Sequence, residues 1–111
     1  MTSMDFNARV YSCIRNIPKG KVATYKQVAT LVGSPNAARA VGLCMKRNPD
    51  APRTPCHRVI ASDGSLTGYS AGNGIETKRE MLEAEGVKFR GNKVDLSVSL
   101  WQPAVEIDLA N

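Results

Sequence analysis

The sequence predicts a small α+β domain, mostly helical, with a winged-helix-like helix-turn-helix and a short β-hairpin. A chain of 111 residues has the commonest size of a single domain. Two short helical segments follow each other between residues 24 and 47, as in a helix-turn-helix. Near the C-terminus, apolar and polar residues alternate on both sides of Gly91-Asn92, which indicates a hairpin. Because we find no repeat, low-complexity tract or linker, we expect residues 1–111 to form one domain.

The first helix is predicted from Asp5 to Ile17. Its apolar residues recur at helical spacing and form one stripe, which should face the core: Phe6, Val10, Cys13, Ile14 and Ile17. Cys13 is therefore predicted to be a core residue. The helix should end at Pro18-Lys19-Gly20.

The second and third helices form the predicted helix-turn-helix. The second begins at a capping box, Thr24-Tyr25-Lys26-Gln27, and Gly33 is its expected terminator. Ser34 as N-cap and Pro35 at the first helical position then start the third helix, which should stop before Asn48-Pro49. Small residues leave most of its surface bare. That pattern is compatible with tight packing on a neighbouring helix and with a flat face for a large partner.

The rest of the chain alternates loops with short elements. Residues 49–55 read as a Pro-rich loop, residues 55–60 as a short extended segment and residues 68–74 as a Gly-rich loop. That loop lacks the Lys-Ser/Thr ending of a phosphate-binding P-loop. A helix is predicted over 75–85, ended by Gly86, followed by hairpin strands at 87–89 and 94–96.

The composition limits the classes of function. The net charge of +5 and the pI of about 9.4 suit a polyanionic partner such as nucleic acid, without requiring one. No apolar run is long enough to span a membrane, and the first residues do not resemble a secretory signal. The three cysteines, Cys13, Cys44 and Cys56, are an odd and sparse set, and the chain has one histidine. We therefore expect a reducing compartment, no disulfide framework and no zinc site.

On the pattern alone, Cys56 is the candidate to carry chemistry, because it stands between Pro55 and the only histidine, His57. A thiol must lose its proton to act as a nucleophile, and a base oriented by a carboxylate is the general means. Adjacent residues of an extended chain point to opposite faces. Cys56 and His57 can therefore cooperate only through a bent backbone or a bridging water. The competing interpretation is a small buried cysteine beside a surface histidine.

Four segments together decide between these interpretations. Asn-Ala-Ala-Arg-Ala-Val-Gly at 36–42, Arg-Asn-Pro at 47–49, Pro-Cys-His-Arg-Val at 55–59 and Gly-Tyr-Ser-Ala-Gly at 68–72 occur in this order. The chain closely resembles the methylated-DNA–protein-cysteine methyltransferases (O6-alkylguanine-DNA alkyltransferases) from about residue 6 to 90. The family often has a further N-terminal domain, and this chain resembles the catalytic domain standing alone.

The resemblance implies roles for the residues around the thiol. Cys56 matches the alkyl acceptor, and His57 matches the residue that activates the thiol through water. Glu85 matches the carboxylate that orients this histidine. Asn48 matches the hinge residue between the recognition helix and the active-site loop, and Arg58 is expected to form a structural ion pair.

The resemblance also implies how DNA and the damaged base are held. Arg39 resembles the arginine that enters the duplex in place of a flipped nucleotide, and a small-residue face would lie in the minor groove: Ala38, Ala40 and Gly42. Further positions match contacts to the flipped nucleotide and its base pocket: Tyr25, Val59, Tyr69 and Ser70. Base flipping is required because the O6 position of a stacked guanine is out of reach of a side chain.

The implied function is DNA repair by one irreversible transfer of an alkyl group from O6-alkylguanine in double-stranded DNA to Cys56. No cofactor, metal or membrane is implied. We expect a monomer in the cytoplasm of a prokaryote or the nucleus of a eukaryote. The alternative is an alkyltransferase-like protein, which binds the same lesions and recruits excision-repair proteins without transfer. The tail from Val94 to Trp101 resembles those proteins, although they carry another residue, often Trp, where Cys56 stands. A DNA-binding regulator is a third class, and it leaves Cys56 unexplained.

Overall fold

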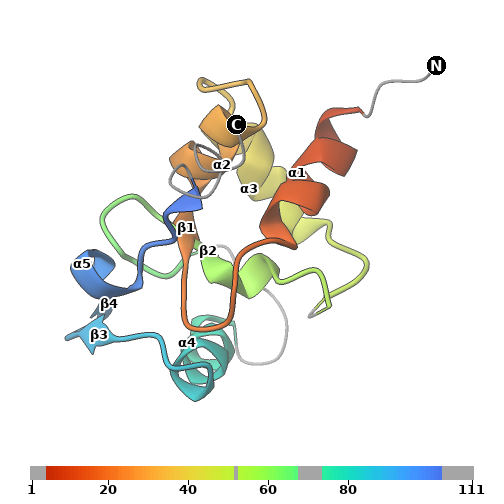
Figure 1. The fold of residues 1–111 in the computed structure, drawn as a ribbon. Helices are drawn as coiled ribbons and strands as arrows, with labels where there is room; N and C mark the ends of the chain where they lie inside the picture. The colour runs from red at the N-terminus through yellow and green to blue at the C-terminus, as the bar shows by residue number, and fades with distance from the viewer. Residues whose placement is uncertain (1–4, 52, 68–73, 104–111) are drawn as a thin grey trace.

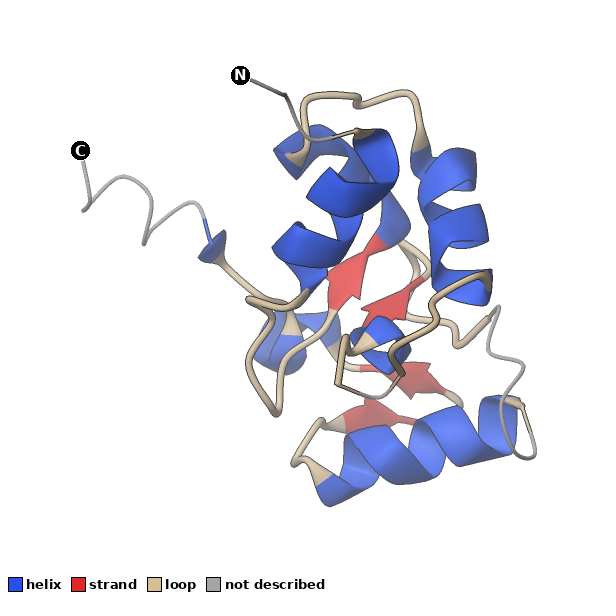
Figure 2. Ribbon diagram, turned by 90° about the vertical axis from the view of Figure 1, so that its right-hand side faces the viewer, coloured by secondary structure: helices blue, strands red, loops and turns tan. Residues whose placement is uncertain are grey.

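Three helices of the N-terminal half pack against one another, and a fourth lies across the short strands from them (Figures 1 and 2). The computed structural model describes residues 5–51, 53–67 and 74–103. The helices are α1 (Phe6–Ile14), α2 (Tyr25–Leu31), α3 (Ala38–Lys46), the 3-10 turn η1 (Cys56–Arg58), α4 (Ile75–Ala84) and α5 (Leu96–Ser99). The strands are β1 (Ala23–Thr24), β2 (Val59–Ile60), β3 (Phe89–Arg90) and β4 (Lys93–Val94). The predicted α+β class with a helix-turn-helix and a hairpin is confirmed.

Helix α1 is shorter than predicted. The Asp5 carboxylate caps its start by accepting the Ala8 N–H at 2.7 Å. After Ile14 the chain tightens into i→i+3 bonds, and Ile17 reaches the core from a turn. Pro18 disfavours a helical conformation at Ile17, so the helix cannot extend to that residue as predicted. Cys13 is only half-buried, at the edge of the core.

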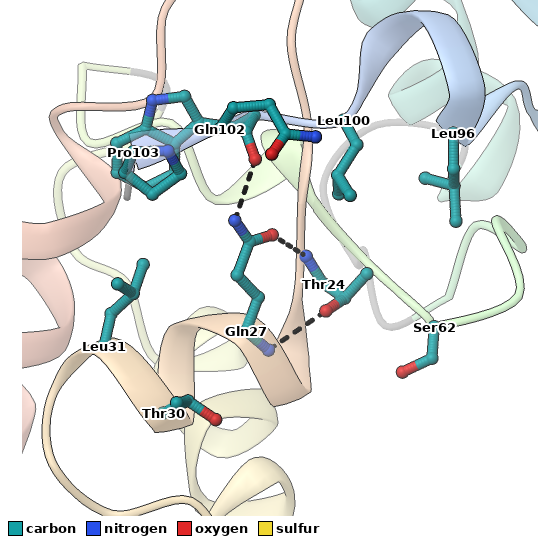
Figure 3. Close-up of a pocket in the computed structure, with 10 residues that line it drawn as sticks. Thr24, Gln27, Thr30, Leu31, Ser62, Leu96, Leu100, Gln102 and Pro103 are labelled. Carbon is teal, nitrogen blue, oxygen red and sulfur yellow. Dashed lines mark hydrogen bonds between the residues drawn. The ribbon is translucent and has the colours of Figure 1, made fainter. Parts of the chain in front are cut away.

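The capping box at the start of α2 is confirmed. The Gln27 N–H donates to the Thr24 hydroxyl at 3.0 Å, and the Thr24 N–H donates to the Gln27 side chain at 3.3 Å. The side-chain Nε2 of Gln27 also donates to the carbonyl of Trp101 at 2.9 Å (Figure 3). One side chain therefore starts α2 and attaches the C-terminal segment to it. Trp101 itself is buried in the core.

The predicted start of α3 at Ser34-Pro35 is wrong, since the helix begins at Ala38 without a side-chain cap. Gly33 ends α2 with a φ of +85°, and the Ser34 N–H donates to Ala29 O at 2.9 Å. This bond, together with the positive φ of Gly33, is typical of a Schellman motif. The backbone of Ser34 therefore belongs to the end of α2. The chain then makes one further turn before α3 starts.

The predicted extended segment at 55–60 is correct only for its last two residues. Residues 56–58 form η1, in which the Arg58 N–H donates to the Pro55 carbonyl at 2.9 Å. Strand β2 then pairs in parallel with β1, with Ala23 opposite Val59. This parallel pairing, which the sequence did not predict, places η1, which precedes β2, at the same end as the segment that precedes β1.

The C-terminal part contains the predicted hairpin and one additional helix. Strands β3 and β4 pair antiparallel, with Phe89 opposite Val94. Gly64 packs so closely on β4 that a Cβ atom there would lie 2.7 Å from Val94 O. The short helix α5 was not predicted; it is capped by Asp95. No helix in the described part of the chain has the length and apolar character to cross a membrane.

Removing the cap of α2 tests its contribution to stability. We expect Thr24→Ala to lower the free energy of unfolding by about 1 kcal/mol, because the Gln27 N–H loses its acceptor. Thr30→Ala is the control: Thr30 is exposed, and its hydroxyl bonds only its own helix at Lys26 O. This change should stay within about 0.5 kcal/mol. Urea denaturation measures both, and equal losses would contradict a capping role.

Candidate active site

Cys56 and His57 lie together in the turn of η1. The backbone is bent here, so the two adjacent side chains are not forced to opposite faces as in a strand. Both are buried, with exposed fractions of 5% for Cys56 and 1% for His57. The Cys56 N–H donates to the Thr54 carbonyl at 2.8 Å. Of the two arrangements that would let these residues cooperate, a bent backbone or a bridging water, the bent backbone is therefore present.

The carboxylate of Glu85 binds both residues that follow Cys56. Glu85 is the C-cap of α4, and its oxygens lie 3.1 and 3.2 Å from Nε2 of His57. Arg58 binds the same two oxygens with Nε at 2.9 Å and Nη2 at 2.7 Å. The expected ion pair of Arg58 is thus present in the bidentate geometry that Arg and carboxylate favour. The third guanidinium nitrogen donates to Ile17 O at 2.7 Å.

Burial leaves His57 neutral despite the neighbouring carboxylate. Burial lowers the pKa of His57, and the bond with Glu85 offsets only part of that change. For Glu85, burial raises the pKa, but hydrogen bonds from Arg58 and His57 outweigh it and the pKa is lowered. An ionised carboxylate only accepts, so the imidazole proton stands on Nε2. The lone pair is then on Nδ1, which is buried and has no hydrogen-bond partner among the described residues.

Lys78 is a charged residue of the site that sequence reasoning missed. It is fully buried, and its Nζ donates to Val59 O at 2.8 Å and to Thr67 O at 2.7 Å. Burial lowers its pKa to about 8, whereas the negative charge of a Cys56 thiolate raises it. Lys78 is therefore a buried cation of the site that interacts electrostatically with Cys56. Its position one turn before the buried Leu82 on α4 was a signal that it faces inward.

Asn48 joins the end of α3 to the segment before Cys56. Its Nδ2 donates to the Thr54 carbonyl at 2.7 Å, and its Oδ1 accepts the Asp50 N–H at 3.0 Å. This carbonyl also accepts the N–H of Cys56. Asn48 therefore lies where the resemblance expects a hinge residue.

A hollow of about 490 Å³ lies on the outer side of α2 and α3. Its lining includes Tyr25, Ala38, Arg39 and Gly42, together with Leu43, Lys46 and Thr67. The Tyr25 hydroxyl donates to Thr67 O at 3.0 Å, the same carbonyl that binds Lys78. Burial raises the pKa of Tyr25, and a charge on Cys56 raises it further. Tyr25 and the Thr67 carbonyl therefore connect the hollow to Lys78.

The other expected contact residues are placed less favourably or lie outside the described residues. Ala40 is half-buried on α3 and does not line the hollow. The side chain of Val59 is fully buried in the core, and its carbonyl is bonded to Lys78. Tyr69 and Ser70 fall outside the described residues. Within the described ranges, no three His, Cys, Asp or Glu side chains gather closely enough to hold a metal ion.

Comparison with known proteins identifies the family. The model of the 6-O-methylguanine DNA methyltransferase DNA-binding domain matches residues 5–87. A methylated-DNA–protein-cysteine methyltransferase of Mycobacterium bovis is 49% identical over 81 residues, which cover 73% of this chain and 48% of that protein. The chain thus spans about half the length of the curated relatives it matches.

Two solved structures extend the comparison. Mycobacterium tuberculosis OGT in complex with DNA is 47% identical, with a TM-score of 0.70, over 77% of this chain and 52% of that one. S. pombe Atl1 in complex with damaged DNA containing O6-carboxymethylguanine is 35% identical, with a TM-score of 0.79, over 93% of this chain and 100% of that one. With a family model matched over most of its length, the chain belongs to the 6-O-methylguanine DNA methyltransferase family.

Proposed function

We propose that this protein repairs double-stranded DNA by moving the alkyl group of an O6-alkylguanine onto Sγ of Cys56. The observation that carries the proposal is the buried Cys56–His57 turn, in which burial keeps His57 neutral and Glu85 orients its ring. The relatives named as methyltransferases support the reaction class. We further propose that residues 1–111 act as one domain, in which acceptor and DNA-binding face lie side by side.

The reaction needs one base and one acid. His57 takes the thiol proton on Nδ1, directly or through a water, and Glu85 holds Nε2–H and stabilises the imidazolium that forms. The sulfur then attacks the alkyl carbon. A carbon–sulfur bond forms, the carbon–O6 bond breaks, and its electron pair passes to guanine, which takes up the proton that the His57 imidazolium gives back, directly or through water. The thioether is stable, so each molecule reacts once.

The hollow on α2 and α3 is proposed to receive DNA. Small residues on α3 permit close approach to the minor groove, whose base pattern is degenerate and suits repair that ignores sequence. Arg39 is exposed at the hollow and is proposed to fill the stack that the flipped guanine leaves. Lys46 and the neighbouring Arg47 would bind phosphates.

A second candidate is lesion binding without transfer. The full-length match to S. pombe Atl1 in complex with damaged DNA favours it. In that function the chain would recruit excision-repair proteins, and Cys56 with its oriented histidine would have no task. The presence of this pair favours the transfer reaction.

Intact-protein mass spectrometry after incubation with O6-methylguanine duplex tests the proposal. We expect the wild-type protein to gain one methyl group, located on Cys56, and Cys56→Ala to gain none while still binding the lesion. Cys13→Ala is the matched control, because Cys13 is half-buried at the edge of the core, and it should react like wild type. Tight lesion binding by the wild type without a mass change would select the second candidate. Transfer by Cys56→Ala would show that another residue is the acceptor.

Arg39→Ala tests how the base is reached. Because Arg39 acts only when a duplex is opened, we expect transfer from duplex DNA to slow about tenfold or more, while transfer from a free alkylated guanine base changes little. Arg39→Lys should restore transfer only in part, since an ammonium lacks the planar guanidinium. Arg90→Ala removes the same charge from β3, which does not line the hollow, and is the control. An equal loss with free base and with duplex would mean that Arg39 supports the fold.

A further inference from the structure

One face of α1 carries polar side chains directed at the elements around Cys56. Asn7, Tyr11 and Arg15 are spaced four residues apart, so they lie along one side of the helix. The Cys44 thiol donates to the Asn7 side chain at 3.2 Å, and the Tyr11 hydroxyl donates to the Cys44 carbonyl at 2.9 Å. Arg15 Nε donates to the Thr54 hydroxyl at 3.0 Å. This face therefore contacts α3 first and then the segment that leads to Cys56.

Thr54 uses all of its polar groups. It is fully buried, two residues before the thiol. Its N–H donates to Asp50 O at 2.9 Å, and its carbonyl accepts from Asn48 Nδ2 and from the Cys56 N–H. Its hydroxyl donates to the Asp50 carboxylate at 3.1 Å while accepting from Arg15. The backbone immediately before Cys56 is therefore held from several directions.

The Thr54 hydroxyl joins two opposite charges. Arg15 belongs to the end of α1 and Asp50 to the loop after α3. Hydrogen bonds that involve an ionised partner are shorter and stronger than neutral ones. A valine of the same shape could occupy this buried position, but it would leave Arg15 and Asp50 without their common partner. The hydroxyl, rather than the volume, is thus what ties α1 to the loop.

We propose that Arg15, Thr54 and Asp50 are positioning residues for alkyl transfer. They fix the backbone before Cys56, so that Sγ is aligned with a flipped guanine that enters from the side of α3. This inference rests on the proposed function. A sulfur must approach the alkyl carbon to about 3–3.5 Å in line, and a misplacement of about 1 Å costs on the order of 100-fold in rate. None of the three residues lines the hollow on α2 and α3. Their loss should therefore slow transfer without weakening the binding of DNA.

Three threonine variants test this role. Thr54→Val removes the hydroxyl and keeps the shape, Thr54→Ser keeps the hydroxyl, and Thr30→Val makes the same change at an exposed site on α2. For each we would measure the single-turnover transfer rate at saturating O6-methylguanine duplex, the Kd for that duplex, and hydrogen exchange of the Cys56 amide by NMR.

We expect Thr54→Val to transfer about tenfold more slowly, within the range for a misplaced reacting group, with a Kd within about twofold of wild type. Its Cys56 amide should exchange about fivefold faster or more, since the bond to Thr54 O opens more often. Thr54→Ser should restore rate and exchange, and Thr30→Val should leave both unchanged. Arg15→Met, a change at an exposed residue, should slow transfer less than Thr54→Val does. In the double variant the two effects on the rate should not multiply, because both changes break the same contact. Arg15→Met also keeps the test decisive if Thr54→Val does not fold.

Two results would overturn the positioning role. One is a Thr54→Val or Arg15→Met protein with wild-type transfer and wild-type Cys56 exchange. The other is a slowing that only parallels a loss of DNA binding. Both require a wild type that transfers the methyl group. A wild type that gains no methyl group is a different result: it refutes the proposed function itself, together with any positioning for it.

Discussion

The site depends on one carboxylate that serves two partners. Glu85 caps the end of α4 and binds both His57 and Arg58. Arg58 also donates to the carbonyl of Ile17, which follows α1. A half-buried charge of this kind is tolerable only when its oxygens are paired and hydrogen-bonded, and the Arg58 fork supplies that pairing. Without the Glu85 carboxylate, η1 would lose its attachment to α4, and the imidazole of His57 would lose its fixed tautomer.

The two sides of the fold divide the proposed work. Residues of α2 and α3 line the hollow that is proposed to receive DNA, and α4 supplies Lys78 and, at its C-cap, Glu85. The carbonyl of Thr67 connects them, because it accepts from Tyr25 on one side and Lys78 on the other. Burial keeps the pKa of His57 low and lowers that of Lys78. A neutral imidazole and a buried cation therefore both lie in the site around Cys56.

Local signals in the sequence predicted the elements better than their connections. The capping box of α2, the inward stripe of α1 and the hairpin at Gly91 are set by neighbouring residues, and they could be read directly. The 3-10 turn at Cys56 and the parallel pairing of β1 with β2 depend on residues far away in the chain. The family resemblance, and not a local signal, pointed to Cys56, His57 and Glu85 as residues of the site. Nothing local indicated that Thr54 would meet Arg15 across 39 positions of sequence.

The protonation state of His57 can be measured, and it decides whether His57 is a neutral base oriented by Glu85. It is the only histidine, so nitrogen-15 NMR of the labelled imidazole is unambiguous. Because burial places the pKa of His57 below 6.5, the ring should be neutral at pH 7 and take up its proton only as the pH falls below that value. We expect a neutral ring with the proton on Nε2, facing Glu85, and no proton on Nδ1. A proton on Nδ1, or an imidazolium at pH 7, would contradict this expectation.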